Sequence, residues 1–342
     1  MNVGILTGGG DCPGLNAVIR AVVKRGLQLG LEFTGIRDGW KGLMQPSTTK
    51  LTNEAVSGIL PVGGTILGTS RTNPMKSPGD TETVINNVKT LGLDAIVCIG
   101  GDDTLGVAAK LFERGIKTIG VPKTIDNDLS GTDFTFGFDT AVSIVTWALD
   151  RLHSTTESHQ RVMVVEVMGR HAGWIAVYGG IAGGADVILI PEMPFDVDEV
   201  CAHVVNRKKK GKRFSLVVAA EGASPKEARG MITKDKELDA FGHVKLGGVG
   251  EFLAGEIEKR TGLESRHVVL GHLQRGGTPT AYDRILATRF GVRAAEMVKE
   301  GRFGRMVALQ GSGIVDVGLD EATSKLKTVD MEMYRTAEIF FG

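Results

Sequence analysis

Residues 94–104 read DAIVCIGGDDT, and residues 116–128 read IKTIGVPKTIDND. Each stretch begins with a short run of mostly apolar, β-branched residues and ends in a segment with acidic side chains. Runs of this kind are typical of strands that are buried on both faces of a parallel sheet. The two stretches therefore predict strands over 94–99 and 116–121, each followed by a loop that carries chemically active side chains.

The same pattern continues outward along the chain. Further strands are predicted over 2–7, 161–167, 186–190, 214–220 and 266–271, and helices over 14–29, 104–114 and 139–156. Strands that alternate with helices indicate an α/β fold in which helices cover both faces of mainly parallel sheets. The 342 residues suggest two domains. Residues 222–265 are rich in glycine and charge, and we expect them to include a long surface excursion.

Composition excludes several classes of function. Lys plus Arg and Asp plus Glu both total 40, which gives no support for binding nucleic acid or a membrane surface. Three cysteines without metal-ligand spacing fit a reducing compartment. The chain begins with a predicted strand and contains no run of 18 apolar residues, so we expect a cytoplasmic protein. The basic run Arg207–Arg213 is either a solvated surface or a site for an anionic effector.

Six clusters of glycine and polar residues follow the predicted strands. They are Gly8–Asp11, Gly100–Thr104, Pro122–Asp128, Met168–Arg170, Glu221–Gly222 and His272–Gly277. Any one of them is an ordinary turn, but the carboxyl ends of parallel strands are also where open α/β sheets bind ligands. Together the clusters predict one binding site at the edges of the sheets.

Gly8–Gly10 precedes a predicted helix and therefore suits an anion such as phosphate. The segment has neither the Walker A pattern nor GxGxxG, which argues against a dinucleotide-dependent dehydrogenase. Taken alone, this glycine turn is as compatible with a structural role as with a functional one.

Two acidic pairs carry the chemistry. Asp102 and Asp103 are carboxylates in a predicted glycine loop, where they suit Mg²⁺, although a solvated turn or helix cap is the alternative. Asp126 and Asp128 flank Asn127, and an Asp there suits a general base in phosphoryl transfer. A calcium loop is the other interpretation, but its acid spacing is absent. Five arginines near the clusters suit phosphate: Arg71, Arg161, Arg170, Arg266 and Arg275.

At this point the chain resembles the ATP- and pyrophosphate-dependent 6-phosphofructokinases over nearly its whole length. The resemblance rests on ordered motifs: TGGGDCPGLNAVIR (7–20), LGTSR (67–71), GGDDT (100–104), PKTIDND (122–128), GFDTA (137–141), SHQRVMVVEVMGRHAG (158–173), AGGAD (182–186), AAEG (219–222) and LGHLQRGGTPTAYDRILATR (270–289). It implies a phosphofructokinase fold of two Rossmann-like, doubly wound domains. A phosphoryl-donor domain is expected over 1–137 plus 275–323, and a fructose 6-phosphate domain over 138–274 plus 324–342.

The resemblance also implies residue roles. Asp126 matches the proton acceptor for the sugar 1-hydroxyl, and Asp102 matches the magnesium-linked acid. Donor-phosphate contacts are implied for Gly9, Arg71 and Thr104. Sugar-phosphate contacts are implied for Thr124, Asp128, Arg161, Met168, Gly169, Arg170, Glu221, Arg266, His272 and Arg275. Because the family supplies Arg161 and Arg266 from a neighbouring subunit, a homo-oligomer is expected, at least a dimer and usually a tetramer.

Two positions bear on the phosphoryl donor. Bacterial ATP-dependent members typically read GGDGS and PGTIDND, whereas here Asp103 and Lys123 replace the two glycines. A carboxylate at 103 would repel the nucleotide α-phosphate, and an ammonium at 123 would stabilise the pyrophosphate leaving group. The pair predicts pyrophosphate as donor, with Asp103 and Lys123 in the catalytic centre. An ATP-dependent enzyme and a non-catalytic, phosphate-sensing homologue are the alternatives.

Effector regulation is a separate question. Arg20, Lys210, Lys212 and Asp186 resemble parts of the allosteric site of the bacterial ATP enzymes. Lys24 stands where that site has arginine, and residues 50–54 contain no arginine. The sequence therefore leaves open whether this chain responds to an effector.

Overall fold

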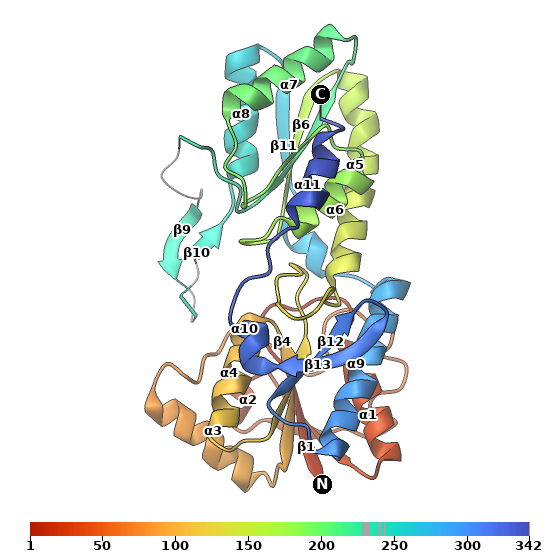
Figure 1. Ribbon diagram of the computed structural model, residues 1–342, viewed down its shortest axis with the longest axis vertical. Coiled ribbons are helices and arrows are strands. Elements are labelled where there is room, and N and C mark those ends of the chain that lie inside the picture. The colour runs from red at the N-terminus through yellow and green to blue at the C-terminus, as the bar shows by residue number, and fades with distance from the viewer. Residues whose placement is uncertain (228–232, 239–240, 243, 342) are drawn as a thin grey trace.

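The computed structural model describes residues 1–227, 233–238, 241–242 and 244–341. Figure 1 shows two layered units stacked along the long axis, each built on a sheet with helices on both of its faces. The N-terminus lies at the free end of one unit, and the C-terminus lies in the other.

A seven-stranded sheet forms the unit that contains the N-terminus. Its order is β13-β12-β5-β4-β1-β2-β3, and only the outer pairs β2–β3 and β12–β13 are antiparallel. The strands are β1 (Asn2–Thr7), β2 (Glu32–Ile36), β3 (Thr48–Lys50), β4 (Ala95–Gly100), β5 (Thr118–Pro122), β12 (Arg305–Gln310) and β13 (Gly313–Gly318).

Alternating side chains of β4 explain the two helical layers. Val97 and Ile99 join one apolar core, whereas Ile96 and Cys98 join the other. Since successive side chains of a strand point to opposite faces, a strand that is apolar throughout needs cover on both sides. One face packs against α1 (Leu15–Gln28) and α9 (Ala281–Glu300). The other packs against α2 (Lys41–Met44), α3 (Pro78–Thr90), α4 (Asp102–Glu113) and α10 (Leu319–Thr323).

The second sheet is parallel throughout and has the order β11-β6-β8-β7. Its strands are β6 (Val162–Val167), β7 (Val187–Leu189), β8 (Ser215–Ala220) and β11 (Ser265–Val269). One face packs against α5 (Phe138–His159), α6 (Trp174–Ala182) and α11 (Met331–Glu338), and the other against α7 (Val197–Lys209) and α8 (Val249–Thr261). The core under α5 is continuous with the core under α1, so the two units share apolar packing.

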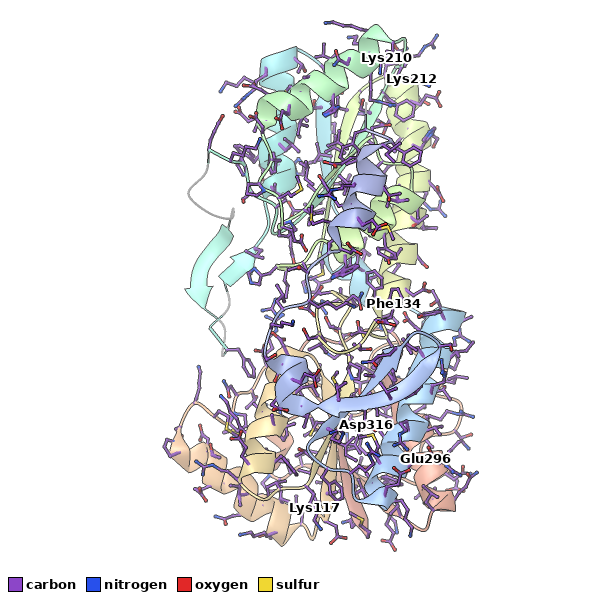
Figure 2. The ribbon with its side chains drawn as sticks, in the orientation of Figure 1. Lys117, Phe134, Lys210, Lys212, Glu296 and Asp316 are labelled. Carbon is purple, nitrogen blue, oxygen red and sulfur yellow. The ribbon has the colours of Figure 1, made fainter. Side chains whose placement is uncertain are left out.

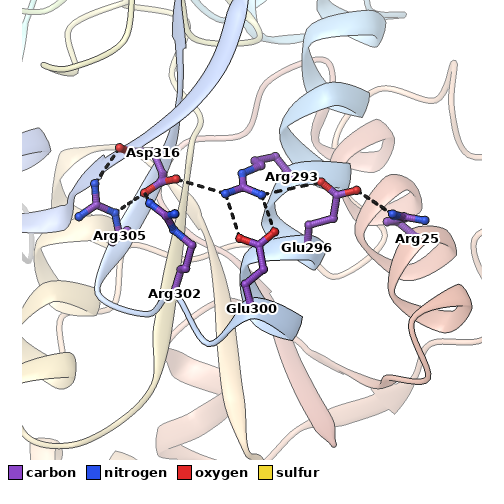
Figure 3. A network of polar contacts seen from close by, with 7 residues as sticks. All are labelled: Arg25, Arg293, Glu296, Glu300, Arg302, Arg305 and Asp316. Carbon is purple, nitrogen blue, oxygen red and sulfur yellow. Dashed lines mark hydrogen bonds and ion pairs between the residues drawn. The ribbon is translucent and has the colours of Figure 1, made fainter.

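An ion-pair network ties the last part of the chain to the first helix (Figure 3). Its centre is Asp316 on β13, whose side chain is 6% exposed and accepts hydrogen bonds from three arginines. Two further carboxylates extend the network to α1. Its members are Arg25, Arg293, Glu296, Glu300, Arg302, Arg305 and Asp316.

The predicted α/β fold with doubly wound, mainly parallel sheets is confirmed, with most boundaries within one or two residues. Two details differ. Asp102 and Asp103 are not in a loop but open α4, where a helix N-terminus stabilises negative charge. The surface excursion expected within 222–265 does not extend over 249–261, which forms α8.

What remains of the excursion includes the two-stranded β9 (Thr233–Leu238) and β10 (Val244–Leu246), while 228–232, 239–240 and 243 lie outside the described residues. Within the described chain, no helix is long and apolar enough to cross a membrane.

Candidate active site

The glycine loop after β1 lies close against side chains from other segments of the chain. A Cβ at Gly8 would lie 2.5 Å from Thr104 Oγ1, and one at Gly10 would lie 2.7 Å from Arg275 Nη1. Gly9 has a φ of 76°, which favours glycine. The loop thus lets Thr104, from α4, and Arg275, from a segment far along the chain, reach the same place.

The backbone N–H groups of Gly8–Gly10 were expected to bind an anion, but two of them already donate hydrogen bonds within the chain. Gly8 N donates to Ile99 O at 2.9 Å, and Gly9 N donates to Ser70 O at 3.1 Å. These bonds extend the pairing of β1 with β4 and hold residues 69–70 over the loop, where Thr69 Oγ1 donates to Gly9 O at 2.6 Å. The loop therefore contributes mainly close approach, and the charge for binding an anion comes from side chains.

Lys123 supplies one such charge from beneath the loop. Its side chain is buried, and its ammonium donates to Gly10 O. Nζ lies 3.5 Å from the position of a Cβ on Gly9. Burial lowers the pKa of this ammonium, with Cys12, Asp126 and Asp11 acting in the opposite direction. The residue that replaces glycine in PKTIDND is thus placed directly against the glycine loop.

The rest of the PKTIDND loop is held by its own polar residues. Asn127 adopts a φ of 53°, and its side chain accepts from Thr135 N at 3.0 Å. Thr124 Oγ1 accepts from Asp126 N at 3.0 Å, while Thr135 Oγ1 donates to Thr124 O at 2.7 Å. These bonds fix a tight turn, because each closes a short loop of backbone on itself. The turn presents Asp126 in a defined position.

Asp126 is 4% exposed, and its Oδ1 has no hydrogen-bond partner among the described residues. Such an atom is costly to bury unless a ligand completes its hydrogen bonding. Since Asp126 also lines the cavity described below, it is placed to accept a hydrogen bond from a bound hydroxyl.

The pKa values of two neighbouring carboxyls, Asp128 and Glu221, are raised well above the ordinary range. Burial raises the pKa of Asp128 to about 7, with Asp126 and Asp102 adding to the effect. Burial also raises the pKa of Glu221 to about 7, with Asp126 contributing. A site in which several carboxyls disfavour one another's charge has a deficit of cations that a bound ion can correct.

Arg170 partly meets this deficit from the second sheet. It follows β6, has a φ of 53°, and its Nη1 lies 4.0 Å from Asp102 Oδ1. Its backbone N donates to Glu221 Oε1 at 3.2 Å. The contact between Arg170 and Asp102 joins the carboxyl edges of the two sheets.

These groups enclose a polar cavity of about 60 Å³. All of its lining residues are glycine, polar or charged: Gly9, Gly10, Arg71, Gly101, Asp102, Asp103, Thr104, Lys123, Thr124, Asp126, Arg170 and Arg275. The structure thus brings together ten residues predicted from sequence. Gly10 and Gly101 belong to the predicted clusters Gly8–Asp11 and Gly100–Thr104, although no individual role was predicted for either of them.

The remaining predicted residues do not line this cavity. Asp128 and Glu221 lie close enough to Asp126 to feel its charge, while Met168 and Gly169 immediately precede Arg170. His272 is exposed on a 3₁₀ turn, η1 (Gly271–Arg275), and it follows β11, which ends at Val269 and not at the predicted residue 271.

Arg161 and Arg266 lie elsewhere. Both are at the amino ends of β6 and β11, about 20 Å along the strand from Arg170. Both pair with Glu264, Arg161 at 3.4 Å and Arg266 at 3.0 Å. Within one chain these two arginines therefore do not reach the cavity.

The basic run Arg207–Arg213 is at the far end of the molecule, where Figure 2 labels Lys210 and Lys212. Arg207 is not a solvated residue, because it pairs with Asp186 at 2.9 Å and both side chains are 12% exposed. Asp186 also accepts from Leu216 N at 2.8 Å. Lys24 donates to Asn53 Oδ1 at 2.6 Å. Asp186, which resembles part of the allosteric site, and Lys24, which departs from it, are thus both engaged within the chain.

The model of the family described as phosphofructokinase matches residues 2–298. The chain belongs to the phosphofructokinase family. The chain is 60% identical over 344 residues to a pyrophosphate–fructose 6-phosphate 1-phosphotransferase of Streptomyces coelicolor (strain ATCC BAA-471 / A3(2) / M145), and the match covers 100% of both chains. It is 55% identical to a protein of the same organism named ATP-dependent 6-phosphofructokinase 3, with 99% of each chain covered.

The fold of this phosphofructokinase agrees with solved structures of the family. A crystal structure of the pyrophosphate-dependent phosphofructokinase from Marinobacter aquaeolei superposes with a TM-score of 0.82 at 26% identity, covering 97% of this chain and 86% of that one. Relatives named for both donors thus match along the whole chain, and the donor has to be argued from the cavity.

Proposed function

We propose that this phosphofructokinase reversibly transfers a phosphoryl group from pyrophosphate to the 1-hydroxyl of fructose 6-phosphate, giving fructose 1,6-bisphosphate and phosphate. The observation that carries the proposal is the small polar cavity, in which Asp103 and Lys123 stand beside the glycine loop. Two relatives that are 60% identical over the full length are named pyrophosphate–fructose 6-phosphate 1-phosphotransferase, which supports the same activity for this chain.

The composition of the cavity favours pyrophosphate over ATP. Sites for organic ligands are lined mostly by apolar and aromatic side chains, whereas every residue that lines this cavity is glycine, polar or charged. Lys123 and Arg71 supply positive charge for the donor phosphates, and Asp103 adds a carboxylate at the first turn of α4. A nucleotide α-phosphate approaching Asp103 would meet like charge.

Asp126 is proposed as the proton acceptor. The 1-hydroxyl donates a hydrogen bond to Asp126, loses its proton to that carboxylate as its oxygen bonds to phosphorus, and the terminal phosphoryl of pyrophosphate leaves its bridging oxygen. Phosphoryl transfer depends mostly on positioning and on offsetting charge, which suits a rigid loop surrounded by Lys123, Arg71 and Arg170. Thr124 and Asp128 lie on the same loop and are proposed to position the sugar.

Magnesium fits the acidic side of the cavity. Asp102 offers a hard oxygen ligand in a site where carboxyls disfavour one another's charge. Asp102 is proposed as the residue that holds Mg²⁺, which when bound would neutralise charge on the transferring phosphates. Asp103 adjoins this position, and Thr104 and Gly9 are proposed as donor contacts.

The sugar phosphate is proposed to lie between the two sheets, on the side of the cavity that Arg170 and Arg275 provide. Met168, Gly169, Glu221 and His272 are its proposed neighbours. Arg161 and Arg266 do not reach this cavity within one chain, so we assign them to the site of an adjacent subunit. That assignment requires at least a dimer, and we propose a tetramer.

The two sheets are proposed to correspond to two domains, a donor domain of residues 1–137 plus 275–323 and a sugar domain of residues 138–274 plus 324–342.

The cytoplasm is proposed as the location of the protein, and the balance of charge is compatible with it.

The reverse reaction tests the proposal. The enzyme should convert fructose 1,6-bisphosphate and inorganic phosphate into fructose 6-phosphate and pyrophosphate, which ³¹P NMR distinguishes from phosphate. Failure to form pyrophosphate under conditions where fructose 6-phosphate binds would overturn the proposed donor.

A further inference from the structure

The chain crosses between the two units for the last time after α10. Figure 1 shows residues 324–330 running from α10 across the boundary to α11. We call this segment the strap. It has no helix or named strand of its own, so its position depends on the contacts that it makes with its neighbours.

On one side the strap pairs with the loop that carries Asp126 and Asp128. Lys327 N donates to Asp128 O at 2.9 Å, and Leu326 forms an antiparallel bridge with Leu129. Ser130 Oγ donates to Lys325 O at 2.9 Å. The strap therefore acts as a short additional strand on the catalytic loop.

The side chain of Lys327 strengthens this attachment. Its Nζ donates to Thr132 O at 3.0 Å and to Asp133 O at 2.5 Å. The ammonium also lies 4.9 Å from the centroid of the Trp174 ring and 5.9 Å from that of Phe134, which Figure 2 labels at the junction of the two units. Carbonyl oxygens and aromatic faces both favour a cation. Burial lowers the pKa of Lys327 to about 8, while Asp133 and Asp128 act in the opposite direction.

On its other side the strap is fastened to the unit that carries Arg170. Trp174 opens α6, and its Nε1 donates to Lys327 O at 3.0 Å. Glu192 accepts from Val329 N at 2.9 Å and from Gly173 N at 3.0 Å. Trp174 and Gly173 belong to the segment that directly follows Arg170, so one connection joins the two loops that face each other across the site.

We infer that Lys327 is a positioning residue that holds the Asp126 loop against the Arg170 loop and so sets the distance between the proton acceptor and the bound fructose 6-phosphate. This inference rests on the proposed function for the identity of the substrate. Lys327 touches Thr132, Asp133 and Trp174, but it is not among the residues that line the cavity. Its effect is therefore indirect and concerns the sugar side of the site.

The inference predicts an unequal effect on the two substrates. In the described chain, the hydrogen bonds and ring contacts of Lys327 do not reach the glycine loop or the start of α4, which form the donor side. Replacing Lys327 with Met keeps the length of the side chain but removes its charge and hydrogen-bond donors. We expect Lys327→Met to raise KM for fructose 6-phosphate at least tenfold and to lower kcat about tenfold, with KM for pyrophosphate within about twofold of wild type.

Two further variants serve as controls. Lys327→Arg retains a cation that donates to carbonyls and stacks on Trp174, so it should restore much of the affinity for fructose 6-phosphate. Lys325→Met makes the same chemical change two residues away on an exposed side chain of the strap, and it should behave like wild type. Thermal unfolding of all three variants is measured separately from the kinetics.

The inference is supported if Lys327→Met raises KM for fructose 6-phosphate but not KM for pyrophosphate, if Lys327→Arg reverses this rise, and if Lys325→Met does not show it. The inference is overturned if both KM values of Lys327→Met are unchanged, or if they rise by equal factors for the two substrates. Either result overturns it even where Lys327→Met unfolds at a lower temperature. Calorimetric titration with fructose 6-phosphate in the absence of donor tests the same difference without turnover. An inactive wild-type enzyme would thus count against the proposed function. The titration would still show whether Lys327 affects the affinity for fructose 6-phosphate. Lys327→Gln replaces the Met variant in both assays if Lys327→Met does not fold.

Discussion

Asp128 is expected to lower the stability of the folded enzyme at neutral pH. Its side chain is 7% exposed, burial raises its pKa to about 7, and Asp126 and Asp102 add to the shift. Asn has nearly the same shape as the protonated acid but cannot ionise. We therefore expect Asp128→Asn to stabilise the protein above pH 7 and to reduce its turnover, because residues shaped for a charged ligand are commonly destabilising without it.

The magnitude follows from the shift in pKa. The rise in the pKa of Asp128 from 3.8 to about 7 corresponds to at most about 4 kcal/mol in the free energy of unfolding. The folded state binds this proton more tightly than the unfolded state, so the contribution of Asp128 to stability is present below pH 4 and is lost as the pH rises through 7. The gain from Asn should be close to zero at pH 4 and largest at pH 8. At this chain length, each kcal/mol corresponds to roughly 1–2 °C in melting temperature.

Asp316 offers a matched control with the opposite sign. Burial alone would raise the pKa of Asp316, but hydrogen bonds from Arg305 and Arg302 outweigh it and hold its pKa below the ordinary value (Figure 3). Its contribution to stability is therefore present at neutral pH and is lost as the pH falls through its lowered pKa. Asp316→Asn should destabilise the protein at pH 8 by on the order of 1–2 kcal/mol, and less at low pH.

The assay is the melting temperature of wild type, Asp128→Asn and Asp316→Asn at pH 5, 6, 7 and 8, without substrates. The melting temperature of Asp128→Asn should rise relative to wild type between pH 5 and 8. That of Asp316→Asn should lie below wild type by a nearly constant margin over this range, because the pKa of Asp316 lies below 3.8 and the carboxylate stays ionised. A melting temperature of Asp128→Asn that stays at or below wild type at pH 8 would refute the argument that the ionised Asp128 is unfavourable in this loop.

Two further changes test the chemistry of the cavity. Asp126→Asn should lower kcat with pyrophosphate by about 10²–10⁴ while leaving the binding of fructose 6-phosphate nearly unchanged, because the amide cannot accept the proton; near-normal kcat would remove Asp126 from that role. Asp103→Gly should raise kcat/KM for ATP relative to pyrophosphate about tenfold, since it removes like charge and volume; Asp103→Asn separates the two effects, and an unchanged ratio in both would show that Asp103 does not select the donor.

Much of the fold was predictable because its strands are buried on both faces. β4 is a continuous run of apolar residues ending in Gly100, β6 is apolar except for the buried Glu166, and the helices beside them repeat with the period that packing on a sheet requires. The start of α4 was placed two residues too late, because glycine and two acids suggest a loop, whereas the helix dipole favours acids in its first turn. The site motifs were predictable because they follow strands whose carboxyl ends meet.

The supporting contacts were not predictable in the same way. Lys327, Trp174 and Glu192 meet the catalytic loops through tertiary packing of segments distant in sequence, and none of them lies in a recognisable pattern. The closure of the glycine loop by Ser70 and Ile99 likewise depends on backbone partners that sequence periodicity does not reveal. Local pattern thus locates the reactive groups, while their relative placement requires the three-dimensional structure.

The central claim is that the donor is pyrophosphate, and the initial rate of fructose 1,6-bisphosphate formation tests it most directly. Wild-type enzyme would be assayed with saturating fructose 6-phosphate and Mg²⁺, with pyrophosphate or ATP as the varied substrate. We expect kcat/KM for pyrophosphate to exceed that for ATP by at least 100-fold, roughly 3 kcal/mol of discrimination. Equal values, or a preference for ATP, would contradict the assignment of Asp103 and Lys123.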